Sequence, residues 1–137
     1  MHQSDFTILV IDDQQVIVDL TTRILNDAGL PALGITDPDE ALRLIESNPS
    51  ISVLLSDVMM PKTTGPQLVR RAQRIRRGGL RVLFMTGGFH GVAFRQTDRI
   101  LEKPWRPEEL VDEVRRVLSD IPDHTVWDGP ERRKWAA

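Results

Sequence analysis

Residues 7–13, TILVIDD, join an uninterrupted apolar run to two aspartates that follow it directly. An apolar run of this length, rich in β-branched residues, is typical of a strand in a parallel sheet with both faces covered. Three further runs end at a polar residue in the same way: SVLLS (52–56) at Asp57, RVLFM (81–85) at Thr86, and RILE (99–102) at Lys103. Because open α/β sheets bind ligands at the carboxyl ends of their strands, we expect these polar side chains to converge on one edge.

The segments between these runs have the apolar spacing of amphipathic helices, and this alternation predicts an α/β fold with a parallel sheet. The expected elements are helices over about 15–27, from Pro38, from near Pro66 and from Pro107, and a short strand around 32–35. Ile17, Leu20 and Ile24 form the expected buried stripe of the first helix. Asp37 can cap the second helix, and Glu40 can complete a capping box there.

Two stretches lack a convincing helical period. Residues 87–98, GGFHGVAFRQTD, contain three glycines. Glycine raises the entropy cost of ordering a backbone, so we expect this segment to be irregular and mobile. Residues 121–137 are polar, and their two prolines and one glycine argue against a long helix. We interpret residues 1–120 as one domain and residues 121–137 as a polar tail or linker.

The composition is that of a soluble globular protein, and 137 residues suit one domain. The chain has no cysteine, which excludes disulfides, zinc thiolates and cysteine nucleophiles. A formal net charge of -2 gives no general attraction to nucleic acid or to anionic membranes. No apolar run is long enough to span a bilayer, and the N-terminal MHQSDF lacks the features of a signal peptide. We therefore expect a cytoplasmic location.

The polar residues after the strands suit a divalent cation together with an anionic group. Asp12, Asp13 and Asp57 supply carboxylate oxygens, which are ligands that Mg²⁺ prefers. A bound cation also lets three carboxylates lie close together without mutual protonation. The Lys103 ammonium and the Thr86 hydroxyl can contact oxygens of an incoming phosphoryl group. A carboxylate can itself attack phosphorus and form an aspartyl phosphate.

A set of short motifs at these positions carries a resemblance to a known family: Asp12-Asp13, Asp57-Val58-Met59-Met60-Pro61 with Gly65, Met85-Thr86-Gly87, and Lys103-Pro104. In this order they make residues 7–120 resemble the receiver domain of two-component response regulators. The resemblance implies a flavodoxin-like, doubly wound sheet of five parallel strands in the order 2-1-3-4-5. Between Thr86 and Lys103 the chain is several residues shorter than the family pattern, so we expect the fourth helix to be shortened or absent.

The resemblance also implies a role for each candidate site residue. Asp57 is the expected phosphoacceptor, and Thr86 and Lys103 are expected to contact the phosphoryl group. The expected Mg²⁺ ligands are Asp12 (acting through water), Asp13, Asp57 and the backbone carbonyl of Met59. The peptide bond between Lys103 and Pro104 is expected to be cis. The implied partners are a histidine kinase or histidine phosphotransfer protein and a downstream protein target, with no direct binding to nucleic acid or membrane.

Two other functions stay open from the sequence. The chain could be the receiver fragment of a hybrid histidine kinase, which only its gene context would decide. It could instead be a phosphohydrolase with an aspartyl nucleophile, but such enzymes usually carry a second acid near the nucleophile, and Met59 stands two residues after Asp57. We therefore expect a signalling domain and not an enzyme, with at most slow self-catalysed phosphorylation and dephosphorylation. The arginine-rich residues 70–81 lack interleaved aromatic side chains and are interpreted as a solvated helix end.

Overall fold

The computed structural model describes residues 6–88, 93–94, 98–119 and 133–134, and the structural statements below refer to these. Five parallel strands form one sheet in the order β2-β1-β3-β4-β6. Its strands are β1 (Thr7–Ile11), β2 (Ala32–Ile35), β3 (Ile51–Asp57), β4 (Arg81–Thr86) and β6 (Arg99–Glu102). The helices are α1 (Gln15–Asp27), α2 (Pro38–Ser47), α3 (Gly65–Arg76) and α4 (Pro107–Ser119). The predicted flavodoxin-like sheet is confirmed, with the order 2-1-3-4-5 when only its own strands are counted.

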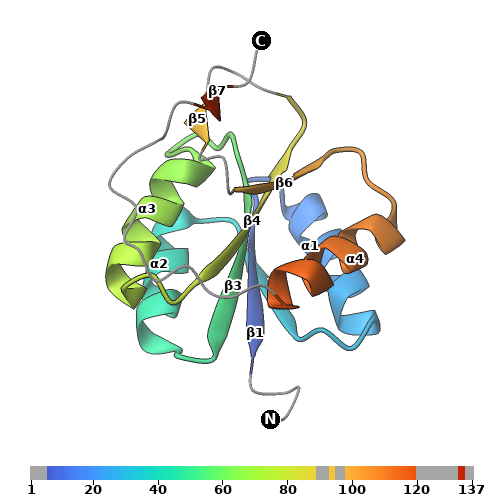
Figure 1. Ribbon diagram of the computed structural model, residues 1–137, viewed down its shortest axis with the longest axis horizontal. Helices are drawn as coiled ribbons and strands as arrows, with labels where there is room; N and C mark the ends of the chain where they lie inside the picture. Colours follow the sequence, from blue (N-terminus) through green and yellow to red (C-terminus); the bar gives the residue numbers. More distant parts are fainter. Residues whose placement is uncertain (1–5, 89–92, 95–97, 120–132, 135–137) are drawn as a thin grey trace.

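The helices cover both faces of the sheet. Figure 1 shows α2 and α3 on one side and α1 and α4 on the other, with the strands between them. Side chains of β1 alternate between two hydrophobic clusters: Leu9 and Ile11 pack with α2 and α3, while Ile8 and Val10 pack with α1 and α4. All four are fully buried. Packing on both faces therefore explains why β1 is apolar without interruption.

The starts of α2 and α3 follow local capping signals. The Asp37 side chain accepts a hydrogen bond from the Glu40 backbone N–H and caps α2, as predicted. The other half of the predicted capping box is wrong, because the Glu40 carboxylate instead accepts hydrogen bonds from the Arg43 guanidinium. A complete capping box occurs at the start of α3, between Thr64 and Gln67. The sequence contains that signal, but we did not identify it.

The buried stripe predicted for α1 is wrong at Leu20, while Ile17 and Ile24 are partly buried and Ile24 packs against the core. Leu20 is 48% exposed, and the buried side chains of the helix are Val18, Thr21 and Leu25. Apolar residues of α1 occupy two overlapping stripes, so periodicity alone does not choose between them. The choice is made by Gly34 on β2, whose missing side chain leaves room for Val18 against the sheet.

The chain between β4 and β6 contains no helix in its described part, residues 87–88, 93–94 and 98. This agrees with the prediction that the helix which the family pattern places between Thr86 and Lys103 is shortened or absent. The helix labelled α4 here comes later in the chain. Between β4 and β6 the chain contains instead the short strand β5 (Ala93–Phe94), which pairs antiparallel with β7 (Arg133–Lys134) from the predicted tail. Figure 1 shows this pair at one end of the molecule. The predicted mobility concerns mainly residues 89–92 and 95–97, which lie outside the described residues.

We predict that Gly34→Ala destabilises the protein by about 1–3 kcal/mol, the usual cost of overpacking. A Cβ at Gly34 would lie 2.2 Å from Val18 Cγ1 and 2.8 Å from Thr22 Cγ2. Val18 is buried and cannot turn away without displacing α1. Denaturant unfolding measures the loss, and Gly87→Ala is the matched control, because a Cβ at Gly87 meets nothing within 4 Å. Equal stability of wild type and the Gly34→Ala variant would contradict the close contact between α1 and β2.

Candidate functional site

The carboxyl ends of neighbouring strands bring the candidate residues to one edge of the sheet. Asp12 and Asp13 follow β1, Asp57 is the last residue of β3, and Thr86 is the last residue of β4. Lys103 follows β6, and its backbone N–H donates to the Thr86 carbonyl at 2.7 Å, which extends the pairing of β4 with β6 by one residue. The peptide bond from Lys103 to the next residue, Pro104, is cis, as predicted.

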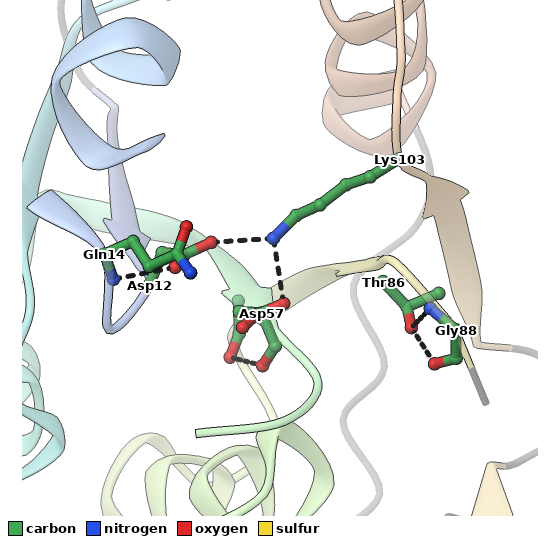
Figure 2. Close-up of polar contacts among 7 residues, drawn as sticks. Asp12, Gln14, Asp57, Thr86, Gly88 and Lys103 are labelled. Carbon is green, nitrogen blue, oxygen red and sulfur yellow. Dashed lines mark hydrogen bonds and ion pairs between the residues drawn. The ribbon is translucent and has the colours of Figure 1, made fainter. Parts of the chain in front are cut away.

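The Lys103 side chain links two of the carboxylates. Its Nζ lies 2.9 Å from Asp12 Oδ2 and 3.1 Å from Asp57 Oδ1, and Figure 2 shows the ammonium reaching both groups. Asp12 is 1% exposed and Asp57 is 7% exposed, so both interactions are largely shielded from water. The second oxygen of Asp12 accepts a hydrogen bond from the Gln14 backbone N–H at 3.0 Å. Each oxygen of Asp12 therefore already accepts a hydrogen bond, whereas Lys103 contacts only Oδ1 of Asp57.

Burial sets the protonation energetics of this pair. It is the largest cause of a raised pKa at Asp57; the negative charge of Asp12 adds to the effect, and Lys103 partly opposes it. At Lys103, burial acts to lower the pKa, but the hydrogen bond to Asp12 and the charge of Asp57 outweigh it, so the pKa of Lys103 is raised overall. Lys103 is therefore positively charged at neutral pH. Ionising Asp57 costs more free energy in the folded protein than in the unfolded chain.

Asp13 completes a cluster of three carboxylates. One oxygen from each of Asp12, Asp13 and Asp57 lies within 4.8 Å of the other two. Asp13 is exposed, so the cluster is open to solvent on that side. With all three carboxylates ionised, Lys103 balances only part of their charge, and a divalent cation would balance the rest. An all-oxygen donor set that keeps access to water fits Mg²⁺, which retains several water ligands.

A close contact at Gly65 places the start of α3 directly against Asp57. The Gly65 N–H donates to the Val58 carbonyl at 2.7 Å. A Cβ on Gly65 would lie 2.5 Å from the backbone oxygen of Asp57 and 3.1 Å from the Phe84 ring. Any larger residue would push α3 away from the end of β3. The glycine that contributed to the family resemblance thus has a packing reason for its position.

The loop between β3 and α3 contains the last candidate ligand, Met59. It forms an isolated antiparallel bridge with Thr64, the residue that caps α3 through its capping box with Gln67. Met59 is 41% exposed, while its neighbour Met60 is buried in the core. The bridge and the cap together fix this short loop directly after Asp57.

The Thr86 hydroxyl is engaged with Gly88. It accepts a hydrogen bond from the Gly88 N–H at 3.0 Å and donates one to the Gly88 carbonyl. Figure 2 shows the hydroxyl directed at Gly88 and not at Asp57. Thr86 is 2% exposed, whereas Gly87 is exposed and Gly88 is half-buried, so the turn leads from the buried end of β4 to the surface. We did not predict the turn, although the two glycines after Thr86 are a recognised turn signal.

Comparison with known proteins points to one family. The model of the response regulator receiver domain matches residues 8–115. The chain is 29% identical over 117 residues to the response regulator receiver protein CpdR of Brucella abortus, covering 81% of this chain and 95% of that protein. It is 28% identical over 121 residues to the transcriptional regulatory protein CpxR of Escherichia coli K12, covering 81% of this chain and 48% of CpxR. The chain thus spans nearly all of one relative and about half of the other.

Solved structures give the same likeness. The receiver domain of the hybrid histidine kinase CckA superposes with a TM-score of 0.71 at 31% identity, covering 82% of this chain and 99% of that one. A CheY-like receiver domain protein of Methanospirillum hungatei superposes with a TM-score of 0.70 at 25% identity, covering 82% and 93% of the two chains. Both agree with the doubly wound sheet described above.

We predict that Asp57→Asn raises the melting temperature of the metal-free protein by a few degrees at neutral pH. The pKa of Asp57 is raised in the folded state, so the folded wild type loses stability as the pH rises from the ordinary value of 3.8 toward the folded-state value. Asparagine cannot ionise and removes this loss. Thermal melts in a chelator at several pH values should show the difference at pH 7 and a smaller one near pH 4.

Asp13→Asn is the matched control, because Asp13 belongs to the same cluster but is exposed. Its melting temperature should change less than that of the Asp57→Asn variant. A neutral-pH melting temperature of Asp57→Asn below that of wild type would mean that the carboxylate stabilises the fold, contrary to the predicted cost of its ionisation.

Proposed function

Because this chain belongs to the response regulator receiver domain family, we propose that it accepts a phosphoryl group on Asp57 and signals through phosphorylation-dependent binding to another protein. The main support is the Lys103 ammonium, which lies within hydrogen-bond distance of Asp57 at the carboxyl edge of the sheet. A cation fixed beside a carboxylate nucleophile can stabilise the charge of an incoming phosphoryl group without further reorganisation.

Asp57 fits the role of phosphoacceptor better than the two neighbouring aspartates. Both oxygens of Asp12 already accept hydrogen bonds, from the Gln14 N–H and from Lys103. Asp13 makes no hydrogen bond or ion pair with any residue that the structure describes, so nothing there would orient it for attack. Asp57 combines a fixed position at the end of β3 with one oxygen that Lys103 does not use.

In the proposed reaction, an Asp57 carboxylate oxygen attacks the phosphorus of a phosphohistidine donor. The O–P bond forms as the P–N bond breaks, and the imidazole nitrogen keeps the bonding electron pair and takes up a proton. Lys103 balances the negative charge of the phosphoryl oxygens. The Thr86 hydroxyl turns from Gly88 and donates to one of these oxygens. Positioning and electrostatics supply most of the catalysis in such a transfer.

We propose Asp13, Asp57 and the Met59 backbone carbonyl as direct ligands of Mg²⁺, with Asp12 acting through water. The spacing of the three carboxylates supports this set. The hydrogen bonds that occupy both oxygens of Asp12 support its indirect role. When bound, the cation would supply charge neutralisation between the carboxylates and the phosphoryl oxygens.

The proposed domain is a phosphoacceptor, not a phosphatase. Met59 has no side-chain group that could orient a water for attack on the aspartyl phosphate, so the phosphate should be lost slowly. The donor is proposed to be a histidine kinase or a histidine phosphotransfer protein, and the same chemistry applies if the chain is part of a hybrid kinase. No helix among the described residues is long and apolar enough to cross a membrane. The cytoplasmic location, the protein target and the absence of direct nucleic-acid or membrane binding stay predictions.

We predict that incubation with Mg²⁺ and a small phosphoryl donor, such as acetyl phosphate, adds one phosphoryl group to Asp57. Intact-mass measurement and peptide mapping locate the modification. Asp57→Asn should abolish labelling, while Asp27→Asn, an exposed change at the end of α1, should not affect it. Labelling of the Asp57→Asn variant at the wild-type level would reject the assignment. Continuous turnover of a phosphomonoester by wild type would favour the phosphohydrolase alternative.

We predict that millimolar Mg²⁺ raises the melting temperature, because a ligand that binds only the folded state stabilises it by mass action. The clustered carboxylates repel one another without a cation, which adds to the effect. Asp13→Asn should reduce the shift strongly. Melts with Mg²⁺ and with a chelator test this. No shift in wild type, or an equal shift in wild type and the Asp13→Asn variant, would exclude the proposed metal site.

A further inference from the structure

The small sheet formed by β5 and β7 joins two parts of the chain that are far apart in sequence. Ala93 pairs with Lys134, and Phe94 pairs with Arg133. β5 belongs to the connection that follows Thr86, whereas β7 belongs to the C-terminal region that the sequence identified only as a polar tail. Figure 1 shows the two strands beside each other at one end of the molecule. The C-terminal region therefore occupies a backbone edge of β5.

β5 is anchored to the strand that carries Thr86. Phe94 is fully buried, and its ring lies edge-on to Phe84 with 5.2 Å between the centroids. Phe84 stands two residues before Thr86 on β4. The Phe84 ring also lies against Gly65, at 3.1 Å from where a Cβ would be, and Gly65 packs on the backbone of Asp57. Phe84 thus connects β5 to Thr86 along β4, and to Asp57 through Gly65.

The connection is fixed a second time at its start, by the hydrogen bonds between Thr86 and Gly88. A threonine hydroxyl has one O–H donor. It cannot donate to the Gly88 carbonyl and to a phosphoryl oxygen on Asp57 at the same time. Phosphorylation would therefore remove a hydrogen bond that shapes the connection only a few residues before β5.

We propose that the edge of β5 is a docking site for the chain's own C-terminal strand, β7, and that occupancy of this site is coupled to the state of Asp57. The unphosphorylated protein holds β7 on β5. The phosphorylated protein, in which Thr86 has left Gly88, releases it, because strand pairing depends on backbone donors and acceptors in register. Docking stands on the strand pairing alone, while the coupling rests on the function proposed above. By linkage, a docked tail opposes phosphorylation by the same factor by which phosphorylation weakens docking.

Docking is tested with two double variants of the 137-residue chain. Arg133→Pro with Lys134→Pro removes both backbone N–H donors of β7, and Arg133→Ala with Lys134→Ala removes the same two charges but keeps the donors. Hydrogen exchange at the amides of Ala93 and Phe94 is measured without phosphorylation. Successive pairs of an antiparallel ladder alternate between hydrogen-bonded and non-hydrogen-bonded, so only one of these two amides faces β7. Exchange at that amide should accelerate about tenfold in the proline variant and change little in the alanine variant. Equal exchange in wild type and the proline variant would overturn the docking site.

Coupling is tested by titrating Mg²⁺-loaded protein with beryllofluoride, a reversible mimic of the phosphoryl group. The proline variant should bind it about threefold more tightly than wild type, and the alanine variant should bind like wild type. In a Thr86→Val background the proline substitutions should have no effect, because the hydroxyl that transmits the change is gone. In a Thr86→Ser background the effect should return.

The outcomes separate this inference from the proposed function. If neither acetyl phosphate nor beryllofluoride reacts at Asp57 in wild type, the proposed function and the coupling both fail, while hydrogen exchange still decides the docking. If beryllofluoride binds wild type and the two double variants with equal affinity, the coupling is overturned and the phosphoacceptor function stands.

Discussion

The contact of one lysine with two buried carboxylates is the interaction on which the site depends. Asp12 and Asp57 come from neighbouring strands and are almost fully buried, and Lys103 provides the cation between them. Buried charges are tolerated only when they are paired and hydrogen-bonded. The order of the parallel strands satisfies this requirement, because β1 and β3 are adjacent in the sheet and β6 is near enough for a lysine side chain to reach across. Without that topology the three residues would not meet.

At two glycines, Gly34 and Gly65, a helix packs so closely against the sheet that a side chain would not fit. Gly34 lets α1 approach the sheet through Val18, and Gly65 lets α3 begin against the backbone of Asp57. In both places a single methyl group would force a helix to move. The packing therefore fixes the positions of α1 and α3 against the sheet. At the site, burial makes the ionisation of Asp57 unfavourable. A bound cation or a phosphoryl group would relieve that cost, which links the local electrostatics to the proposed function.

The sequence predicted those features that depend on local patterns. Apolar runs located the strands of the main sheet, and the polar residue after each run located the edge where Asp12, Asp57 and Lys103 meet. The stripe of α1 could not be predicted, because the choice between two apolar stripes is made by a glycine on another strand. The pairing of β5 with β7 could not be predicted from the sequence either, because each strand has two residues and their contact joins distant segments. Hydrogen-bond partners such as Gly88 for Thr86 depend on the folded backbone.

The most direct test of this account is an experimental structure of the protein with Mg²⁺ and beryllofluoride. The account predicts beryllium bonded to an Asp57 carboxylate oxygen and the Lys103 ammonium on a fluorine atom. The Thr86 hydroxyl should donate to another fluorine and no longer to the Gly88 carbonyl. A beryllofluoride group at a different residue, or one bound to Asp57 while Lys103 and Thr86 keep the partners they have now, would contradict the proposed phosphoacceptor site.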